Sequence, residues 1–436
     1  MTSECFVYIT LPGTTDMVTA GRFRLETDLQ GNAVGRFVYG RTYMARADRV
    51  EFDPRELKIA QTVFTTAKLG GVFGALRDAA PDSWGRRLID RQIGVPGLNE
   101  IDYLLKSPDD RAGALGFGLN QQPPAPVWKF SRTVDLGSLI DIADKIVADD
   151  VDPDAGPIDR DDLEQVERLL QAGTSMGGAR PKATVEHDGH LWLAKFPMIG
   201  DKFNNPRVEH AAMTLARRCG LETAKSDVVS VGQRDVLVVR RFDRDAAENG
   251  YYRKRMVSAL TMLQADETRD SRWSYVALAE EMRRFVSGNI DTQLHELFRR
   301  MCFNCLISNT DDHPRNHAFV ADGNGWRLSP AYDITPAPTS SVSRRDLAMD
   351  IGRAGRYANI HNLISEAARF SLSRQDAESI IHTMADQVRS TWYATARAAG
   401  VSELDCERIS SAFVYDGFSY EGEPRDELLF EASFGR

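Results

Sequence analysis

The chain of 436 residues has few cysteines, no long apolar run and no excess of basic residues. Five cysteines in a chain of this length do not make a disulfide framework. No window approaches the roughly 18 consecutive apolar residues that a membrane helix needs. A formal net charge of -9 argues against a protein that grips nucleic acid through its own field. The first residues, MTSECFVYITLPG, lack a basic stretch followed by an apolar one. We therefore expect a cytoplasmic protein with no signal peptide and no membrane span.

What is present is an ordinary globular composition, 42% hydrophobic and 27% charged, with length enough for two or three domains. Residues 4 to about 60 are rich in β-branched and aromatic residues between Gly, Pro and Asn, which predicts strands. Helix-forming sequence follows at 71–94, with Pro81 and Asp82 at an internal restart. The acidic stretch 149–162 predicts a solvated linker, and strands return from 174 to about 245. Helices dominate from about 255, apart from 308–340. We expect an α+β protein divided at 1–140, 141–245 and 246–436.

Cys302 and Cys305 form a C-x-x-C pattern within LFRRMCFNCLIS. Met301, Cys302, Cys305 and Leu306 repeat at helical spacing, and no second cysteine pair offers a zinc site. The segment also lacks the strand-then-helix setting of a thioredoxin motif. We interpret these cysteines as buried thiols of the core.

The stretch LISNTDDHPRNHAFV (306–320) combines acidic, histidine and amide side chains. Asp311, Asp312, His313 and His317 have the composition of a metal-dependent hydrolase site. Pro314 stands between the two histidines, however, and disfavours the helix that would place both imidazoles on one face. Asp311 and Asn316 instead follow the D-x-x-x-x-N spacing of a protein-kinase catalytic loop. There the Asp accepts the proton of the attacking hydroxyl and the Asn holds magnesium.

The sequence after this stretch favours the kinase alternative. HAFVADGNGWRLSPAYD predicts a strand, a tight turn and a second strand, and it ends at Asp333. A kinase needs a second Asp delivered back to the metal in this way. One Asn and one Asp suit Mg²⁺, which takes few protein carboxylates together with phosphate oxygens.

Three earlier stretches match other parts of a kinase nucleotide site. KATVEHDGHLWLAKFP predicts a hairpin that turns at Asp188-Gly189 and places Lys195 in line with Leu191 and Leu193. Upstream, GTSMGGARPKA (173–183) is a glycine-rich segment whose backbone amides can cradle phosphates. In NNPRVEHAAMTLARRCG we expect a helix capped by Asn205, from which Glu209 pairs with Lys195. The alternatives are a snorkelling Lys195, a plain turn at 173–183, and a Glu209 that only satisfies the helix dipole.

Taken together, these stretches resemble the HipA-type serine/threonine kinases, the toxin components of bacterial type II toxin–antitoxin modules. The stretches that carry the resemblance lie in the family's order along nearly the whole chain: LRDAAPDSWGRRLID, SPDDRAGALGF, SMGGARPKA, LAKFP, VVRRFDR, NTDDHPRNHAFV and SPAYDITP. The resemblance implies a protein-kinase-related fold. It has a β-rich N-terminal part, a small lobe containing strands, and a helical C-terminal lobe.

The resemblance also implies roles for individual residues. Asp311 is the expected catalytic base, and Asn316 and Asp333 are the expected Mg²⁺ ligands. The expected contacts to ATP come from the glycine-rich loop, from Lys195, from the strand that leads to the hinge and from the catalytic loop: Gly177, Gly178, Ala179, Arg180, Pro181, Lys182, Lys195, Arg240, Arg241, Phe242, His313, Arg315, Asn316, Tyr332 and Asp333. Ser175 occupies the place of the serine whose autophosphorylation expels the loop and silences the kinase, with Thr174 as a neighbouring alternative. A phosphate of about -2 charge there would repel ATP.

The resemblance further implies partners. A small helix-turn-helix antitoxin, HipB-like, is expected to hold the kinase and to bind operator DNA. The expected substrate is an aminoacyl-tRNA synthetase, with glutamyl-tRNA synthetase as the model. The sequence departs from some relatives at Asp312, Arg315 and Arg240, and the last bears only on side-chain recognition at the hinge. Two other interpretations stay open, a catalytically idle scaffold in a repressor complex and the metal-dependent hydrolase.

Overall fold

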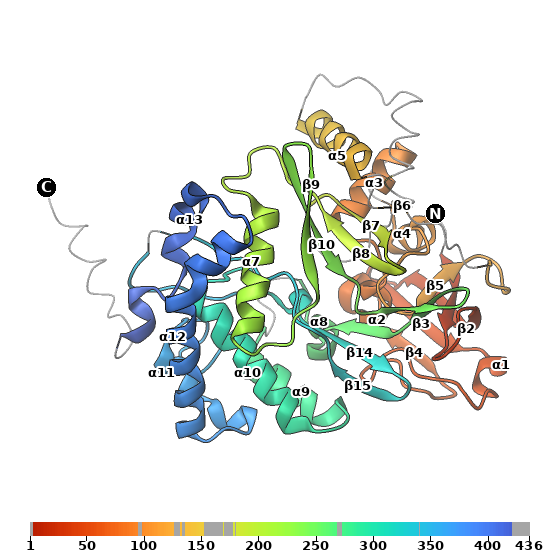
Figure 1. Cartoon of the computed structure of the whole chain (residues 1–436). Coiled ribbons are helices and arrows are strands. Elements are labelled where there is room, and N and C mark those ends of the chain that lie inside the picture. Colours follow the sequence, from red (N-terminus) through yellow and green to blue (C-terminus); the bar gives the residue numbers. More distant parts are fainter. Residues whose placement is uncertain are drawn as a thin grey trace, which may run out of the picture.

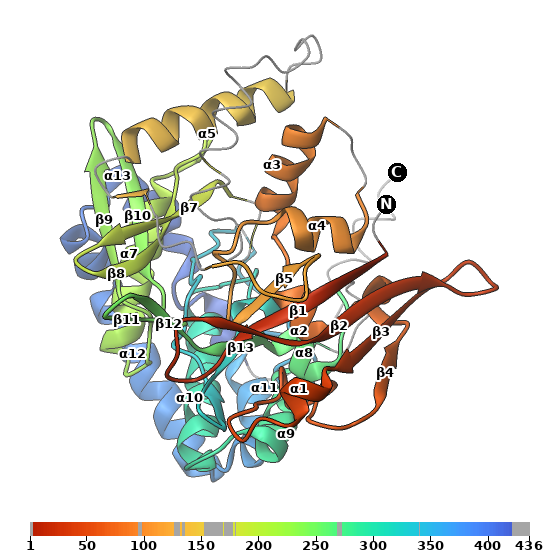
Figure 2. The same ribbon diagram turned by 90° about the vertical axis from the view of Figure 1, so that its right-hand side faces the viewer.

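The computed structural model describes residues 3–94, 98–125, 131–132, 136–151, 169, 178, 180–267, 273–339 and 341–420. An antiparallel five-stranded sheet with the order β4-β3-β2-β1-β5 forms the N-terminal part (Figure 2). Its strands are β1 (Glu4–Thr10), β2 (Met17–Thr27), β3 (Ala33–Tyr39), β4 (Val63–Thr66) and β5 (Leu115–Gly118). Alternation fixes the faces, because Phe37 and Tyr39 are buried while Arg36 and Val38, which alternate with them, are exposed.

Short helices connect and flank this sheet. They are α1 (Arg41–Met44), α2 (Gly74–Asp78), α3 (Ser83–Ile93) and α4 (Glu100–Lys106). The expected restart at Pro81 and Asp82 is confirmed, since the Asp82 carboxylate caps α3 by accepting from the backbone N–H of Gly85 at 2.8 Å. Trp84, Leu88 and Ile89 form the buried face of α3.

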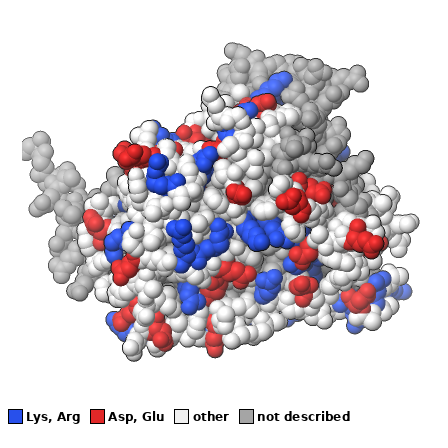
Figure 3. Space-filling model, in the orientation of Figure 1, with Lys and Arg blue, Asp and Glu red and all other residues white. Residues whose placement is uncertain are grey.

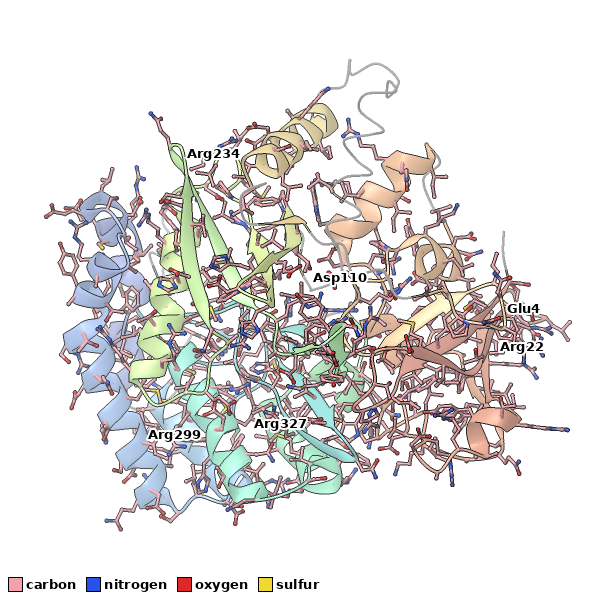
Figure 4. All side chains as sticks on the ribbon, turned by 45° about the vertical axis from the view of Figure 1, so that its right-hand side comes forward. Glu4, Arg22, Asp110, Arg234, Arg299 and Arg327 are labelled. Carbon is pink, nitrogen blue, oxygen red and sulfur yellow. The ribbon has the colours of Figure 1, made fainter. Side chains whose placement is uncertain are left out.

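The small lobe is a second five-stranded sheet with the order β6-β7-β8-β10-β9 (Figure 1). Its elements are β6 (Ser131–Arg132), α5 (Leu136–Val151), β7 (Lys182–His187), β8 (His190–Lys195), α7 (Asn205–Arg218), β9 (Ser226–Val231) and β10 (Arg234–Arg240). The expected hairpin is confirmed, and Asp188 and Gly189 at its turn both have positive φ, 49° and 68°. The tip of β9–β10 carries Arg234, which pairs with Asp144 of α5 at 2.7 Å (Figure 4).

The cap of α7 differs by one residue from the expectation. The side chain of Asn204, rather than Asn205, accepts from the N–H of Arg207 at 3.1 Å. The side-chain nitrogen of Asn204 also donates to Asp235 at 2.7 Å. Both the oxygen and the nitrogen of the Asn204 side chain therefore have partners. Pro206 lies in the first turn, as predicted.

The C-terminal half is mainly helical and lies beside the small lobe, with α12 packed against both α7 and α10 (Figure 1). Its strands are β11 (Arg244–Ala247), β12 (Gly250–Arg253), β13 (Arg255–Ser258), β14 (Ala318–Asp322) and β15 (Gly325–Leu328). Its helices are α8 (Ala259–Leu263), α9 (Tyr275–Phe285), α10 (Ile290–Leu306), α11 (Ile360–Ser365), α12 (Arg374–Ala398) and α13 (Glu403–Ile409). Cys302 and Cys305 lie in α10 with no exposed surface, which confirms them as core thiols.

The fold is the expected α+β arrangement, with a core that runs through all three expected parts. One cluster of buried side chains extends from Cys5 in β1 to Phe418 near the end of the described chain. The expected boundaries fall inside α5 and inside β11, so a division there would cut a helix and a strand. The three-part division therefore stays a prediction.

None of the described helices combines the length and the apolar sequence that crossing a bilayer requires. On the face drawn in Figure 3, basic and acidic side chains lie beside one another across most of the surface. This mixed pattern is consistent with the net charge of -9.

Candidate active site

Lys195 stands at the centre of the candidate site, at the end of β8. Its Nζ lies 2.7 Å from Oε1 of Glu209 in α7 and 2.8 Å from Oδ1 of Asp333. The structure thus brings together three predicted residues that are up to 138 positions apart in the sequence. Lys195 thus pairs with Glu209, as predicted, and its ammonium group does not snorkel to water.

The charges of this group depend on one another. Burial lowers the pKa of Lys195, but the Asp333 and Glu209 carboxylates outweigh it and hold the pKa above its ordinary value. Burial raises the pKa of Asp333, and the ammonium of Lys195 outweighs this and holds the pKa below the usual range. For Glu209 burial dominates, so its pKa is raised. Lys195 therefore stays a cation and Asp333 an anion at neutral pH, as a phosphate-holding lysine and a metal-binding carboxylate require.

The two residues before Asp333 hold its backbone in place through hydrogen bonds to other segments. Asp333 itself has φ of +57°, in the left-handed region that only a minority of non-glycine residues adopt. Ala331, two residues earlier, exchanges backbone hydrogen bonds with the segment before β9. The Tyr332 hydroxyl donates to the carbonyl of Arg315 at 2.8 Å. This bond joins the residue before Asp333 to the residue before Asn316, and so links the segments that carry the two predicted Mg²⁺ ligands.

The catalytic loop between α10 and β14 presents Asp311 on the surface. Asp311 is exposed, and its carbonyl accepts from the N–H of His313 at 2.8 Å and from the side-chain amide of Asn316 at 3.0 Å. Pro314 to Asn316 form a single 3-10 turn. The loop therefore folds back on itself, with its predicted base pointing to solvent and its predicted metal ligand tied to the same residue.

Asp312 and His317 belong to the protein interior and not to a metal site. His317 Nε2 lies 2.7 Å from Asp312 Oδ1, and the Tyr275 hydroxyl donates to the other Asp312 oxygen. Asn304 of α10 donates to the Tyr275 oxygen at 3.1 Å. Within the described chain, no group of three or more His, Cys, Asp or Glu side chains could hold a metal ion. The four residues of the hydrolase alternative are thus split between surface and core.

Removing the Tyr275 hydroxyl tests this buried network. We expect Tyr275→Phe to lower the free energy of unfolding by about 1–3 kcal/mol, because a buried carboxylate and the Asn304 amide each lose a partner. Tyr393→Phe, at a tyrosine that is 44% exposed, is the matched control and is expected to change little. Urea unfolding of both variants measures the difference, and equal stabilities would mean that the network contributes nothing.

The glycine-rich loop is only partly described. Ser175, Thr174, Gly177 and Ala179 lie outside the described residues. Gly178 has φ of +98°, which favours glycine, and Arg180 pairs with Asp201.

Lys182, at the end of this loop, is buried and pairs with the N-terminal part of the chain. Its Nζ lies 2.6 Å from Oδ2 of Asp82, the cap of α3, and donates to the Gly178 carbonyl at 2.9 Å. Pro181, beside it, is also buried. The structure thus shows Lys182 fastening the loop to α3, and its predicted contact with phosphate stays a prediction. Sequence reasoning placed Asp82 at the restart of a helix but missed its pairing with Lys182, because the two residues are 100 positions apart.

Two backbone N–H groups of the predicted hinge segment, residues 240–242, already donate hydrogen bonds within the protein. The N–H of Arg240 donates to the Lys225 carbonyl at 2.8 Å and that of Arg241 to the Leu191 carbonyl at 2.9 Å. A backbone contact from this segment to adenine would therefore use Phe242 or the carbonyl groups. The Phe242 ring lies 5.5 Å from the ring of Tyr332, so two predicted nucleotide-site residues pack on each other.

The Arg241 side chain has a structural position that the sequence did not reveal. Its guanidinium is fully buried and pairs with Asp110 of the N-terminal part and, at 2.9 Å, with Asp243. It also donates to the Arg111 carbonyl at 2.8 Å. Figure 4 shows Asp110 near the middle of the molecule. The predicted contact of Arg241 with ATP would thus have to come from its backbone.

A cleft of about 520 Å³ opens beside the catalytic loop. Asp311 and His313 line one wall, and Gly178 of the glycine-rich loop also borders it. Arg77 and Asp82, from the N-terminal helices, line another part. Nδ1 of His313 is buried and has no hydrogen-bond partner among the described residues, as expected of a group that awaits a ligand.

The chemistry of these residues fits ATP and magnesium. Lys195 supplies a fixed cation, and the His313 nitrogen is a polar atom without a partner in the described chain. Asn316 and Asp333 supply the oxygen donors that Mg²⁺ prefers, and two protein ligands leave room for phosphate oxygens. Fold and site together define a two-lobed protein of the kinase-like α+β class.

Comparison with known proteins agrees with this class. Residues 174–392 match the family model described as the HipA-like C-terminal domain. The chain is a member of the HipA family.

Two curated relatives and one solved structure extend this result. The chain is 25% identical over 214 residues to a putative kinase of Haemophilus influenzae, covering 42% of this chain and 59% of that protein. It is 24% identical over 204 residues to the serine/threonine-protein kinase toxin HipA of Shewanella oneidensis, covering 41% and 46%. The matched regions span about half the length of these relatives. Its fold matches Shewanella oneidensis HipA, solved with HipB and operator DNA, with a TM-score of 0.60, 16% identity and 94% coverage of both chains.

Proposed function

We propose that the chain is an ATP- and Mg²⁺-dependent protein serine/threonine kinase. The observation that carries the proposal is the Lys195 cation held at 2.7 Å from Glu209 and 2.8 Å from Asp333, in a chain that also exposes Asp311 on the cleft. A kinase needs this lysine–glutamate pair and a metal-binding aspartate in place at once. A catalytically idle scaffold does not require Lys195, Asp311, Asn316 and Asp333 to be present together, and their joint presence weighs against that alternative.

The chemistry follows from the positions of these groups. Asp311 accepts the proton of a serine hydroxyl, whose oxygen attacks the γ-phosphorus of ATP. The bond from that phosphorus to the bridging oxygen breaks, and ADP leaves. Lys195 holds phosphate oxygens, and Asn316 and Asp333 would hold magnesium, which supplies charge neutralisation when bound. Positioning and charge account for most of such catalysis.

The biological role that we propose is that of a growth-arresting toxin in the cytoplasm. HipA of Shewanella oneidensis is a serine/threonine-protein kinase toxin and was solved with HipB and operator DNA. By analogy, a HipB-like helix-turn-helix antitoxin holds this chain and carries it to operator DNA, which fits its mixed surface charge (Figure 3). The proposed substrate is an aminoacyl-tRNA synthetase of the glutamyl type. Autophosphorylation of Ser175 silences the enzyme by placing charge in a phosphate-binding loop.

Intact mass of the purified protein tests the proposal. The protein is first stripped with phosphatase, then incubated with Mg²⁺ and ATP, and any change is mapped to a peptide. We expect a gain of one phosphate on Ser175. No gain with nucleotide binding intact would favour the scaffold, or a kinase that modifies only its target. No gain and no ATP binding would overturn the proposal.

A further inference from the structure

Helix α2 of the N-terminal part reaches the catalytic loop through a continuous set of ion pairs. Arg77 of α2 pairs with Glu100 of α4 at 2.7 Å and with Glu267 at 3.2 Å. Glu267, which follows α8, pairs in turn with Arg315 of the catalytic loop. We call Arg77, Asp78, Glu100, Glu267 and Arg315 the α2 network.

Asp78, next to Arg77 in α2, contacts Arg315 of the catalytic loop from another direction. Its Oδ1 lies 4.0 Å from the Arg315 guanidinium. Arg315 is therefore bracketed by Asp78 directly and by Arg77 through Glu267. Arg315 immediately precedes Asn316 and lies in the same short loop as Asp311, so its position and theirs are set together.

Helix α2 is a fixed support because it packs tightly on α8. Asp78 accepts from the backbone N–H and the hydroxyl of Ser258 and from the hydroxyl of Thr261, each at 2.7 Å. A Cβ added at Gly74, the first residue of α2, would lie 2.5 Å from the Thr261 side chain. This close approach leaves α2 little freedom to shift relative to the C-terminal lobe.

The charges of the network are maintained at working pH. Burial raises the pKa of Glu267, but Arg315 and Arg77 outweigh it and hold the pKa below its usual range. Glu100 behaves in the same way between Arg86 and Arg77. Planar guanidinium groups pair with carboxylates in a fixed geometry, so such pairs define position as well as charge.

We infer that α2 positions the catalytic loop, with Arg77 and Glu267 as positioning residues that act through Arg315. The inference rests on the proposed kinase function. It gives the N-terminal part of the chain, which precedes the small lobe, a role in that function. In kinase chemistry a displacement of about 1 Å at the reacting groups costs about a hundredfold in rate. Neither Arg77 nor Glu267 need touch ATP or the phosphate acceptor to have this effect.

Glu267→Gln is the variant that tests the inference, because Glu267 is 48% exposed and the amide keeps its shape. We expect the rate of phosphate gain at saturating Mg²⁺-ATP to fall about tenfold to a hundredfold. The affinity for a fluorescent ATP analogue is expected to fall much less than the rate, because the Lys195 group is unchanged and Arg315, an expected ATP contact, is displaced rather than removed. In an Arg315→Gln background, Glu267→Gln should add almost no further loss, since both act through one contact.

Glu366→Gln is the matched control. Glu366 also bridges two arginines, at 2.9 Å from Arg353 and 3.7 Å from Arg369, but in the C-terminal helices away from the cleft. It should leave the rate of phosphate gain unchanged. If Glu267→Gln and Glu366→Gln have the same rate as the unmodified protein, the positioning role is wrong.

Hydrogen exchange separates failure of this inference from failure of the proposed function. We expect Glu267→Gln, and not Glu366→Gln, to speed amide exchange in the peptide 308–320, whether or not the protein transfers phosphate. Faster exchange in Glu267→Gln, when the unmodified protein neither gains phosphate nor binds ATP, would keep the positioning role and overturn the kinase. Unchanged exchange would overturn the positioning role, whatever the activity.

Discussion

Asp311→Asn is expected to lower phosphoryl transfer by about 10²- to 10⁴-fold while the protein stays folded and binds ATP. The carboxylate is exposed on the cleft, and Asn has nearly the same shape but cannot accept a proton from the attacking hydroxyl. The loop geometry should survive, because it is the Asp311 carbonyl that binds His313 and Asn316. Time courses of phosphate gain by intact mass, with ATP-analogue titration, measure both parts.

Asp322→Asn serves as the control for this prediction. Asp322 is another exposed aspartate of the same lobe, at the end of β14 and on the hairpin that follows the catalytic loop. It should behave as the unmodified protein in both assays. A phosphorylation rate in Asp311→Asn close to that of the unmodified protein would show that Asp311 is not the base, and any phosphate gained would have another origin.

Arg241→Met is expected to lower the free energy of unfolding by about 3–5 kcal/mol. The guanidinium has no exposed surface, and Asp110 and Asp243 beside it are 4% and 0% exposed. Met fills much of the same volume, so the cost comes from two buried carboxylates that each lose the Arg241 cation, while Asp243 keeps Arg244. Chemical denaturation monitored by fluorescence measures the change. An effect below about 1 kcal/mol would contradict the idea that this pairing holds the N-terminal part to the hinge.

The pH dependence of Arg241→Met has a definite sign. In the unmodified protein burial raises the pKa of Asp243, but Arg241 and Arg244 outweigh it and hold the pKa well below the usual range. That contribution to stability is present above about pH 3.9 and is lost only in stronger acid. Without Arg241 the pKa of the Asp243 carboxyl rises, and a carboxyl whose pKa is raised favours folding at low pH. The deficit of the variant should therefore shrink as the pH falls from 7 toward about 4.

Arg374→Met is the control for both measurements. Arg374 pairs with Glu378 at 2.7 Å on the surface of α12 and is 74% exposed. Exposed pairs of this kind contribute at most about 0.5 kcal/mol, so little change is expected at any pH.

Local patterns in the sequence predicted the elements that carry the site. The Asp188-Gly189 turn, the strand that ends at Lys195 and the hairpin before Asp333 all form as expected, because positive φ at a turn and alternation along a strand are local properties. The pairing of Lys195 with Glu209 was also predicted, since the kinase pattern supplied the partner. The helix cap was misplaced by one residue because Asn204 and Asn205 are both good caps, and Asp235 selects the first.

The contacts between the N-terminal part and the kinase half were not predictable in the same way. Asp82 with Lys182, and Arg77 with Glu267, join residues 100 and 190 positions apart. The local sequence around each of these side chains predicts only a helix cap or an exposed surface charge. The pairing of the Arg241 side chain with Asp110 was missed for the same reason, because the two residues are 131 positions apart.

The buried cross-contacts limit how this protein can be recombined with its relatives. The matched family region begins at residue 174, so a chimera joined there would take Lys182, Arg241 and Glu267 from one parent. It would take Asp82, Asp110 and Arg77 from the other. Unless both parents carry the same partners, the hybrid takes one carboxylate partner from Lys182 and one from Arg241, which keeps Asp243, and loses a support of its catalytic loop. Exchange of the N-terminal part is therefore expected to succeed only when the three pairs are transplanted together.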